Sequence, residues 1–521
     1  MRTSRVAIVG AGIGGLAAAI DLARQGVEVL VFEAGASPGG KMRTLDVGGA
    51  RLDAGPTVLT MRETFEAIFA DAGASLADHV TLRPLALLAR HAWSEDERLD
   101  LFADPQHSAD AIGRFAGAEA ARGFEAFRRR ARDIYETLEP IFMRAPRPSP
   151  LGLVAAAGIG GLGRLSRISP FATLWSALGG YFRDGRLRQL FARYATYCGS
   201  SPFAAPATLM LIAHAEMKGV FVVEGGIHRL ALAMARLATR SGAAFRYDTA
   251  VARIIVAGGR ASGVHLASGE CVPADFVVCN ADANALATGL LGPEARSAAP
   301  PTPPAMRSLS AATFLVHGRA DGFPLPRHSV FFSGDYPAEF ADIFGRGRLP
   351  AEPTVYVCAQ DRDERPDHPP AGAERIFCLV NAPPIGDRHV FTATEVEQCR
   401  ERAFRRLEQC GLRLDPSAAP MRSVTPNDFD RLYPGTGGAL YGPASHGWTA
   451  SFRRPGSRTR LPGLYLAGGS THPGPGMPMA ATSGRLAAAA LIADLGSMPR
   501  FQPTAMPGGT SMRSATTAGT A

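Results

Sequence analysis

Lysine is nearly absent from this chain of 521 residues. Only Lys41 and Lys218 are lysines, so arginine supplies almost all of the 55 basic side chains. The excess over 47 acidic side chains is small, and the high proportion of arginine does not by itself indicate a polyanionic partner. Zinc-finger spacing, an arginine-rich arm and an aromatic RNA-binding motif are missing too, so no nucleic-acid partner is expected.

Paired cysteines and long apolar runs are also missing. The seven cysteines are scattered without a CxxC pair, which predicts reduced core thiols in a cytoplasmic compartment and no metal site. No uninterrupted apolar stretch reaches the roughly 18 residues of a membrane-spanning helix. The first apolar run has the pattern of a β-strand and not of a signal peptide.

A glycine-rich turn near the N-terminus joins a predicted strand over 5–9 to a predicted helix over 16–25. In such a turn the first glycine permits the tight bend, the second lets a pyrophosphate approach the backbone, and the last allows close helix–strand packing. The helix start then offers N–H groups and a positive dipole end to phosphates. The candidate dinucleotide-binding glycines are Gly10, Gly12, Gly14 and Gly15.

An acidic residue ends the second predicted strand, over 27–33. Glu33 stands where a carboxylate accepts hydrogen bonds from a ribose, and it would repel the 2′-phosphate of NADP. Gly40 and Lys41 follow. A rare lysine here is either a compact charge for the ligand or a chance residue on a solvated loop. Arg43 is a second candidate for a phosphate contact.

A second glycine-rich segment lies near the C-terminus, after a predicted strand over 461–466. Gly468 and Gly469 let the backbone approach a ligand, and Pro478 fits the first turn of a helix running to about residue 495. That helix would direct the positive end of its dipole at a group above 476–479. A negative charge that develops on that group would be stabilised by on the order of 1 kcal/mol. His472 is either an acid–base group or a histidine bonded to the backbone.

The pattern of elements predicts a discontinuous nucleotide domain of residues 1–72, 216–300 and 455–496. Helices are expected over 61–72 and 110–140, and alternating strands within 301–451 predict an antiparallel sheet. The insertions 73–215 and 301–454 would form a substrate domain, and 497–521 should be disordered. The apolar stretch 151–163 is flanked by arginines and is either a membrane-surface segment or a buried glycine-rich turn.

The chain resembles the FAD-dependent carotenoid desaturases of the bacterial phytoene-desaturase type. The resemblance rests on both glycine-rich ends, on Asp53-Ala-Gly-Pro-Thr57, on Gly225-Gly226 and on Thr471-His-Pro-Gly474. It implies an α/β fold, with a Rossmann-like FAD domain of the glutathione-reductase and amine-oxidase type and a substrate domain of antiparallel sheet plus helices. It also implies that FAD contacts residues beyond the glycine fingerprint, namely Gly55, Pro56, Thr57, Val251, Met477, Pro478 and Met479.

Within this family, Met479 and the segment Thr57-Val-Leu-Thr-Met61 look more like the 1-hydroxycarotenoid 3,4-desaturase branch. That resemblance implies hydride transfer to FAD from an acyclic 1-hydroxy or methoxy carotenoid of the spheroidene or spirilloxanthin pathway, without identifying a proton acceptor. It further implies peripheral attachment to the inner or photosynthetic membrane, with quinone or oxygen as electron acceptor. A phytoene desaturase, a carotenoid ketolase and a flavin-free lipid-binding escort protein are the alternatives.

Overall fold

The computed structural model describes residues 4–146, 149–150, 152–153, 155, 171–362, 370–414 and 419–497. The predicted tail 497–521 lies outside these residues except for Ser497, and so does most of the apolar stretch 151–163. Among the helices within these ranges, none has both the length and the hydropathy needed to cross a bilayer.

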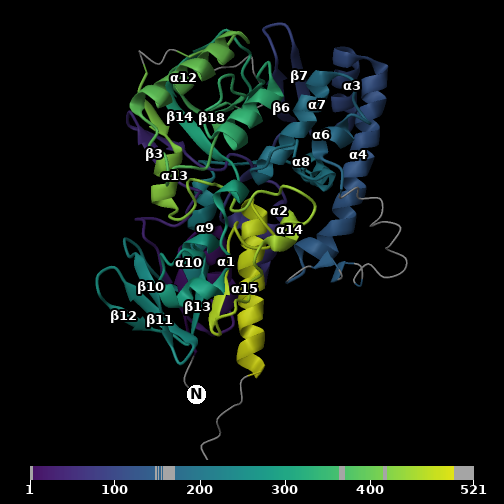
Figure 1. Ribbon diagram of the computed structural model, residues 1–521. Coiled ribbons are helices and arrows are strands. Elements are labelled where there is room, and N and C mark those ends of the chain that lie inside the picture. Colours follow the sequence, from purple (N-terminus) through teal and green to yellow (C-terminus); the bar gives the residue numbers. More distant parts are fainter. Residues whose placement is uncertain are drawn as a thin grey trace, which may run out of the picture.

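A parallel sheet of five strands forms the lower half of the molecule in Figure 1, in the order β21-β13-β1-β2-β9. Its strands are buried, as expected for apolar runs covered on both faces. Helices α1, α2, α9 and α15 share one core with the sheet, while the small antiparallel sheet β10–β12 and α10 share the other. The bounds are β1 Arg5–Val9, β2 Glu28–Phe32, β9 Ala244–Arg246, β13 Phe276–Cys279, β21 Leu464–Leu466, β10 Val251–Ala257, β11 Arg260–Leu266, β12 Cys271–Pro273, α1 Ile13–Ala23, α2 Arg62–Asp71, α9 His228–Arg240, α10 Ala283–Ala287 and α15 Met477–Ser497.

A second sheet of seven strands forms the upper half, in the order β20-β14-β18-β17-β16-β6-β7. Helix α12 packs on one face through the core that contains Phe314 and Phe404. The sheet is mostly antiparallel, as predicted, but it also recruits β6 and β7 from the first insertion, and β6 pairs with β16 in parallel. The bounds are β6 Leu87–Ala92, β7 Arg98–Phe102, β14 Ser310–Gly318, β16 His328–Phe331, β17 Val355–Ala359, β18 Glu374–Ala382, β20 Met421–Val424 and α12 Ala393–Glu408.

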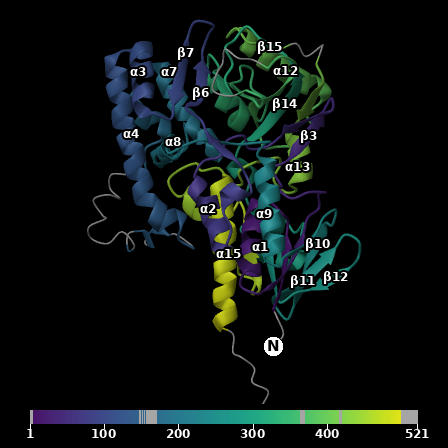
Figure 2. The same cartoon turned by 180° about the vertical axis from the view of Figure 1, so that it is seen from behind.

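A helical region lies beside this sheet, and Figure 2 shows it from behind with α4 along its outer edge. The single helix expected over 110–140 is two helices, because Gly117 has φ +89° and breaks the chain between α3 and α4. Aromatic side chains such as Phe124, Phe127 and Phe191 fill the core of this region. The bounds are α3 Pro105–Ala116, α4 Ala118–Leu138, α6 Leu174–Leu178, α7 Gly185–Ala192 and α8 Leu211–Met217.

Shorter elements complete the fold. Their bounds are β3 Thr44–Val47, β4 Ala50–Asp53, β5 Leu82–Pro84, β8 Phe221–Val223, β15 Ala320–Asp321, β19 Arg413–Leu414, α11 Tyr336–Phe340, α13 Pro426–Leu432 and α14 Ala450–Arg453. The α/β class with an inserted sheet-and-helix region is thus confirmed. The prediction that all cysteines are core thiols is wrong for Cys271, which is exposed on the edge strand β12.

Candidate cofactor and substrate site

The carboxyl ends of three neighbouring strands meet at one point of the parallel sheet. Gly10 follows β1, Asn280 follows β13, and Gly468 follows β21 by one further residue. The amide nitrogen of Asn280 donates to the Gly10 carbonyl at 3.3 Å. A Cβ added to Gly12 would lie 2.7 Å from the same amide nitrogen, and one added to Gly468 would lie 3.0 Å from its oxygen. Asn280 therefore stands between the two glycine-rich segments.

Helices α1 and α15 cross in close contact at two glycines. A Cβ on Gly484 would lie 2.0 Å from the Gly14 carbonyl oxygen, and one on Gly14 would lie 2.9 Å from the Ala480 carbonyl oxygen. Gly15 fits as closely, since its Cβ would lie 2.1 Å from the carbonyl oxygen of Gly10. Only glycine permits these approaches. The crossing brings the N-terminal turns of both helices to the same edge of the sheet.

The carboxylate of Glu33 is fixed beside the first turn. It accepts hydrogen bonds from the backbone N–H of Ala11 at 2.7 Å and of Gly35 at 2.9 Å. Carboxylate oxygens have lone pairs left over after two such bonds, so Glu33 can still accept bonds from a ribose. Val251 begins β10 and packs on the core that contains Phe32, and two residues earlier Thr249 N–H donates to the Glu33 carbonyl.

The segment around Gly40, Lys41 and Arg43 packs on the glycine turn. A Cβ on Gly40, whose φ is +57°, would lie 3.2 Å from the Cα of Gly12. The Lys41 ammonium donates to the Leu440 carbonyl at 2.5 Å and lies 5.1 Å from the Tyr433 ring centre. Burial lowers the pKa of Lys41, while the charge of Asp282 raises it. Lys41 is thus held inside the protein and does not lie on a solvated loop.

Arg43 carries the clearest sign of a missing anionic or polar ligand. Its Nε and Nη2 atoms are buried and have no hydrogen-bond partner among the described residues. A buried donor without a partner is costly, and native proteins seldom keep one that nothing satisfies. The Phe429 ring lies 5.9 Å from the guanidinium carbon and holds the side chain in place.

The segment Gly55-Pro56-Thr57 stacks directly on Lys41. A Cβ on Gly55 would lie only 1.8 Å from the Lys41 carbonyl oxygen. Just before it, Asp53 accepts a hydrogen bond from Ile227 N–H at 2.8 Å, one residue before α9 begins. A Cβ on Gly226 would lie 2.6 Å from that carboxylate. The motifs Asp53–Thr57 and Gly225-Gly226 therefore meet at the Asp53 carboxylate and form one structural joint.

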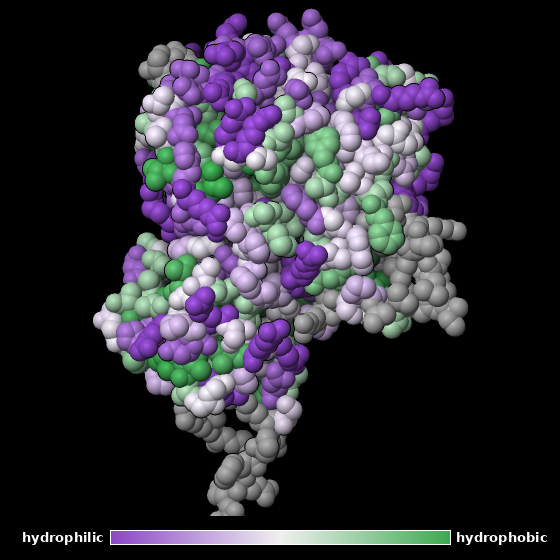
Figure 3. Space-filling view, in the orientation of Figure 1, coloured by the Kyte–Doolittle hydropathy of each residue, from purple (hydrophilic) through white to green (hydrophobic). Residues whose placement is uncertain are grey.

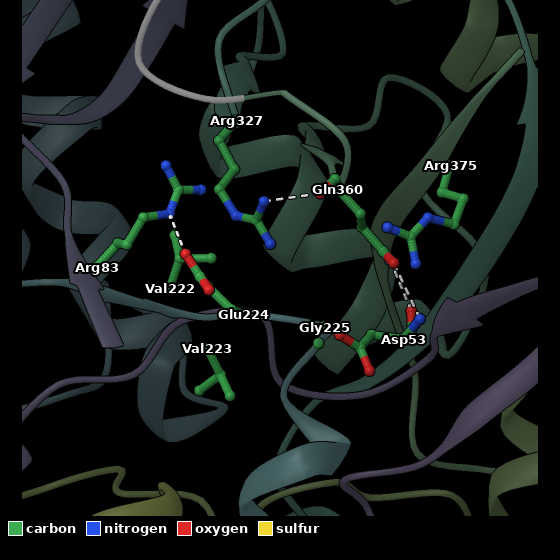
Figure 4. A pocket seen from close by; sticks show the side chains of 10 residues that line it. Asp53, Arg83, Val222, Val223, Glu224, Gly225, Arg327, Gln360 and Arg375 are labelled. Atoms are coloured by element: carbon green, nitrogen blue, oxygen red, sulfur yellow. Dashed lines mark hydrogen bonds and ion pairs between the residues drawn. The ribbon is translucent and has the colours of Figure 1, made fainter. Parts of the chain in front are cut away.

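A polar cavity of about 310 Å³ opens at this joint. Figure 4 shows Asp53 next to Gln360, whose side chain bonds both the N–H and the carbonyl of Asp53 at 3.0 and 2.9 Å. Burial raises the pKa of Asp53, although the N–H groups at the start of α9 oppose the shift. Asp53 thus holds the joint together. The lining residues are Asp53, Arg83, Val222, Val223, Glu224, Gly225, Gly226, Arg327, Gln360 and Arg375.

The start of α15 separates the nucleotide part from the helical region. Met477 and Pro478 are buried in its first turn, and Met479 packs with Met61 against Tyr135 and Met143. Gly469 is packed less closely than Gly14 and Gly15, because a Cβ there would make only an ordinary contact, 3.7 Å from Pro475.

The imidazole of His472 is buried and faces Phe142 at 5.0 Å between ring centres. Burial lowers the pKa of His472 to about 4, so the ring is neutral at physiological pH. Neither ring nitrogen has a hydrogen-bond partner among the described residues, so the alternative of a backbone-bonded ring is not found, and the edge-on contact with Phe142 fits a packing role better than acid catalysis.

The residues gathered at this edge of the sheet fit FAD on the structure's own terms. Gly12 begins α1 without a capping side chain, which leaves first-turn N–H groups for a phosphate. Glu33 can receive a ribose, Arg43 offers unpaired donors, and α15 begins at the far end. Sequence reasoning missed Asn280, Tyr433 and the Leu440 carbonyl. The polar residues that follow the apolar run 276–279 were the available signal for Asn280, whereas nothing in the pattern placed 433 or 440 beside Lys41.

The fold and the comparisons with known proteins define an FAD-dependent oxidoreductase. The chain belongs to the family of flavin-containing amine oxidoreductases, whose model matches residues 13–492. It is 54% identical to the hydroxyneurosporene desaturase of Rubrivivax gelatinosus over all of this chain and 99% of that one. The hydroxyneurosporene desaturase of Cereibacter sphaeroides is 46% identical over 95% of this chain and 99% of its own. An oxidoreductase from Methanosarcina mazei has the same fold, with a TM-score of 0.59 and 16% identity over 94% of this chain and 100% of that one.

Proposed function

We propose that this chain introduces the C3–C4 double bond into an acyclic carotenoid that carries a 1-hydroxy or 1-methoxy group. The full-length likeness to hydroxyneurosporene desaturases is the observation that carries the choice of substrate. The escort-protein alternative is not favoured, because the chain retains Glu33, the glycine cradle and the unpaired donors of Arg43. When bound, FAD supplies the acceptor for the hydride that leaves the polyene.

We propose specific roles for the predicted site residues. The glycines of the N-terminal turn, with Arg43 and Lys41, hold the phosphate end, and Glu33 holds a ribose. The backbone from Gly55 to Thr57 and the first turn of α15 hold the ring end, where the helix dipole favours negative charge. The apolar core of the helical region would exclude water and orient the polyene. We assign the adenine end to the strand that begins at Val251.

We also infer that the enzyme works at a membrane surface, with quinone or oxygen as the terminal acceptor. Phe171 and Trp448 are 79% and 45% exposed, and their rings are 5.5 Å apart. Exposed aromatic pairs of this kind suit a water–lipid boundary. Figure 3 shows polar side chains gathered densely at the end that carries α12, away from the level of α14. Liposome flotation of wild type and of the double variant Phe171→Ser, Trp448→Ser tests this inference, and equal flotation would overturn it.

A competition assay tests the proposed reaction. The FAD-loaded protein is offered 1-hydroxyneurosporene, phytoene and a ketolase substrate in separate liposomes, and the pigments are separated afterwards. We expect a new C3–C4 double bond in the 1-hydroxy substrate alone. Conversion of phytoene alone would overturn the assignment and make the chain a phytoene desaturase.

A further inference from the structure

A chain of three polar side chains crosses the interior beside the proposed flavin site. The Thr57 hydroxyl lies 2.6 Å from the Tyr356 hydroxyl, which lies 2.8 Å from Nδ1 of His328. Tyr356 and His328 belong to the adjacent strands β17 and β16, and their rings are stacked with 18° between their planes. At the end of this hydrogen-bonded series, Nε2 of His328 is buried and has no hydrogen-bond partner among the described residues.

The unpaired nitrogen belongs to the sheet face that looks toward the helical region. His328 and Val330 share one face of β16, since side chains alternate along a strand, and Val330 packs in the core of the helical region. Helix α12 covers the opposite face. The face that carries His328 meets the helical region next to Thr57, whose hydroxyl contacts Tyr356, and Thr57 belongs to the segment that starts at Gly55 in the proposed flavin site.

The nearest polar cluster on the helical side is already paired. Tyr194 and Tyr197 both donate their hydroxyls to Glu216, and Arg193 donates to the Tyr197 oxygen at 3.2 Å. This cluster has a partner for each of those hydroxyls. His328 differs from the other buried polar groups without a partner, such as Nε2 of His91 and the Tyr336 hydroxyl, because its second ring nitrogen is linked through Tyr356 to Thr57.

His328 is a neutral hydrogen-bonding group. Burial lowers its pKa to about 3, and the positive charges of Arg327 and Arg193 act in the same direction. A neutral imidazole has one N–H and one lone pair, so Nε2 either donates or accepts when Nδ1 is engaged with Tyr356. A hydroxyl group can form a hydrogen bond with Nε2 in either case, because it is both donor and acceptor.

The substrate's chemistry requires such a group near the reacting bond. In a 1-hydroxy carotenoid the oxygen is attached to C1, which is two bonds away from C3, one of the carbons that lose hydrogen. Any side chain that binds the hydroxyl group must therefore lie close to the proposed ring end of the cofactor site, as Thr57, Tyr356 and His328 do. A wall built for a pure hydrocarbon would gain nothing from an unpaired imidazole nitrogen and would bear its desolvation cost.

We propose that Nε2 of His328, oriented by Tyr356 and Thr57, binds the tertiary hydroxyl group of the substrate and so places C3–C4 at the flavin site. The proposal rests on the proposed function and adds to it the residue that recognises the oxygen. His328 is thus a specificity-determining residue, while Tyr356 is a positioning residue.

The test compares two polyenes that differ only in the hydroxyl group. Dissociation constants are measured by quenching of tryptophan fluorescence, and kcat/KM by pigment analysis, for wild type, His328→Phe, Tyr356→Phe and His328→Gln. The matched control is Ser310→Ala, which removes another buried hydroxyl without a partner among the described residues, on the α12 side of the same sheet. Flavin content and Tm are measured for every variant, and the isosteric Tyr356→Phe serves if His328→Phe does not fold.

We expect His328→Phe to bind the hydroxy polyene roughly 10- to 100-fold more weakly, the range of a lost buried hydrogen bond, with the hydrocarbon polyene little affected. Glutamine should restore part of the preference, and the control should keep all of it. If both polyenes weaken equally in a variant with full flavin content, the proposal is overturned. If wild type converts neither polyene, the proposed function fails instead, whatever the binding ratio.

Discussion

Gly484→Ala should separate the two glycine-rich ends of the molecule. The new methyl carbon would be placed 2.0 Å from the Gly14 carbonyl oxygen, a backbone atom that no side-chain rotation can move. Ordinary contact begins near 3.4 Å, so α15 must shift from α1 by more than 1 Å. Alanine is favoured over glycine in a helix by about 1 kcal/mol, but overpacking of this severity costs about 1–3 kcal/mol or more. Net destabilisation is therefore expected, concentrated at the crossing of α1 and α15 beside the proposed cofactor site.

The assay is the ratio of flavin absorbance to protein absorbance after purification, together with Tm in the presence and absence of added FAD. We expect Gly484→Ala to lose most of its flavin and to gain less Tm than wild type when FAD is added. Gly496→Ala is the matched control in the same helix, because nothing lies within 4 Å of its Cβ position. A Gly484→Ala protein with full flavin content and unchanged Tm would refute the close-crossing argument.

Three further predictions concern other parts of the site and the fold. Glu33→Gln should weaken FAD binding roughly 10-fold through loss of charge-assisted hydrogen bonds, measured by titrating apoprotein; unchanged affinity would remove Glu33 from the ribose site. Met479→Gly should lower Tm and increase the share of non-hydroxylated polyene converted, because it empties space beside Tyr135; an unaltered product ratio would contradict this role. Burial raises the pKa of Glu339 to about 7, so its protonated form stabilises the fold below about pH 4.5 and this contribution falls as pH rises toward 7. Wild-type Tm should therefore fall relative to Glu339→Gln over that interval, and parallel Tm–pH curves would rule the effect out.

Periodicity and glycine spacing predicted the nucleotide half of the fold well. Strand β1 was expected over 5–9 and α2 over 61–72, and both lie within a residue of those bounds, whereas α1 begins three residues before the predicted 16 and β21 three residues after the predicted 461. These elements carry local signals, namely β-branched runs, helical spacing and turn glycines. Their agreement is physical, because buried parallel strands must be apolar throughout.

The second sheet was less predictable because its strands come from distant segments. β6 lies more than 230 residues before its parallel partner β16 in the sequence, and no local pattern reveals such a pairing. For the same reason Tyr433 beside Lys41, and Tyr356 and His328 beside Thr57, could not be found from spacing alone. Gly117 is a different kind of miss, because it lies within a local pattern that is strongly helical. Its positive φ, which divides the predicted helix into α3 and α4, was not anticipated.

Single-turnover stoichiometry tests the central claim most directly. FAD-loaded protein is mixed with excess 1-hydroxy carotenoid under anaerobic conditions with no added acceptor, and product is counted per flavin. Because one desaturation releases one hydride and one proton, we predict one 3,4-desaturated molecule per bound FAD and none from flavin-free protein. Equal product from the flavin-free protein, or none from fully loaded protein, would contradict the account.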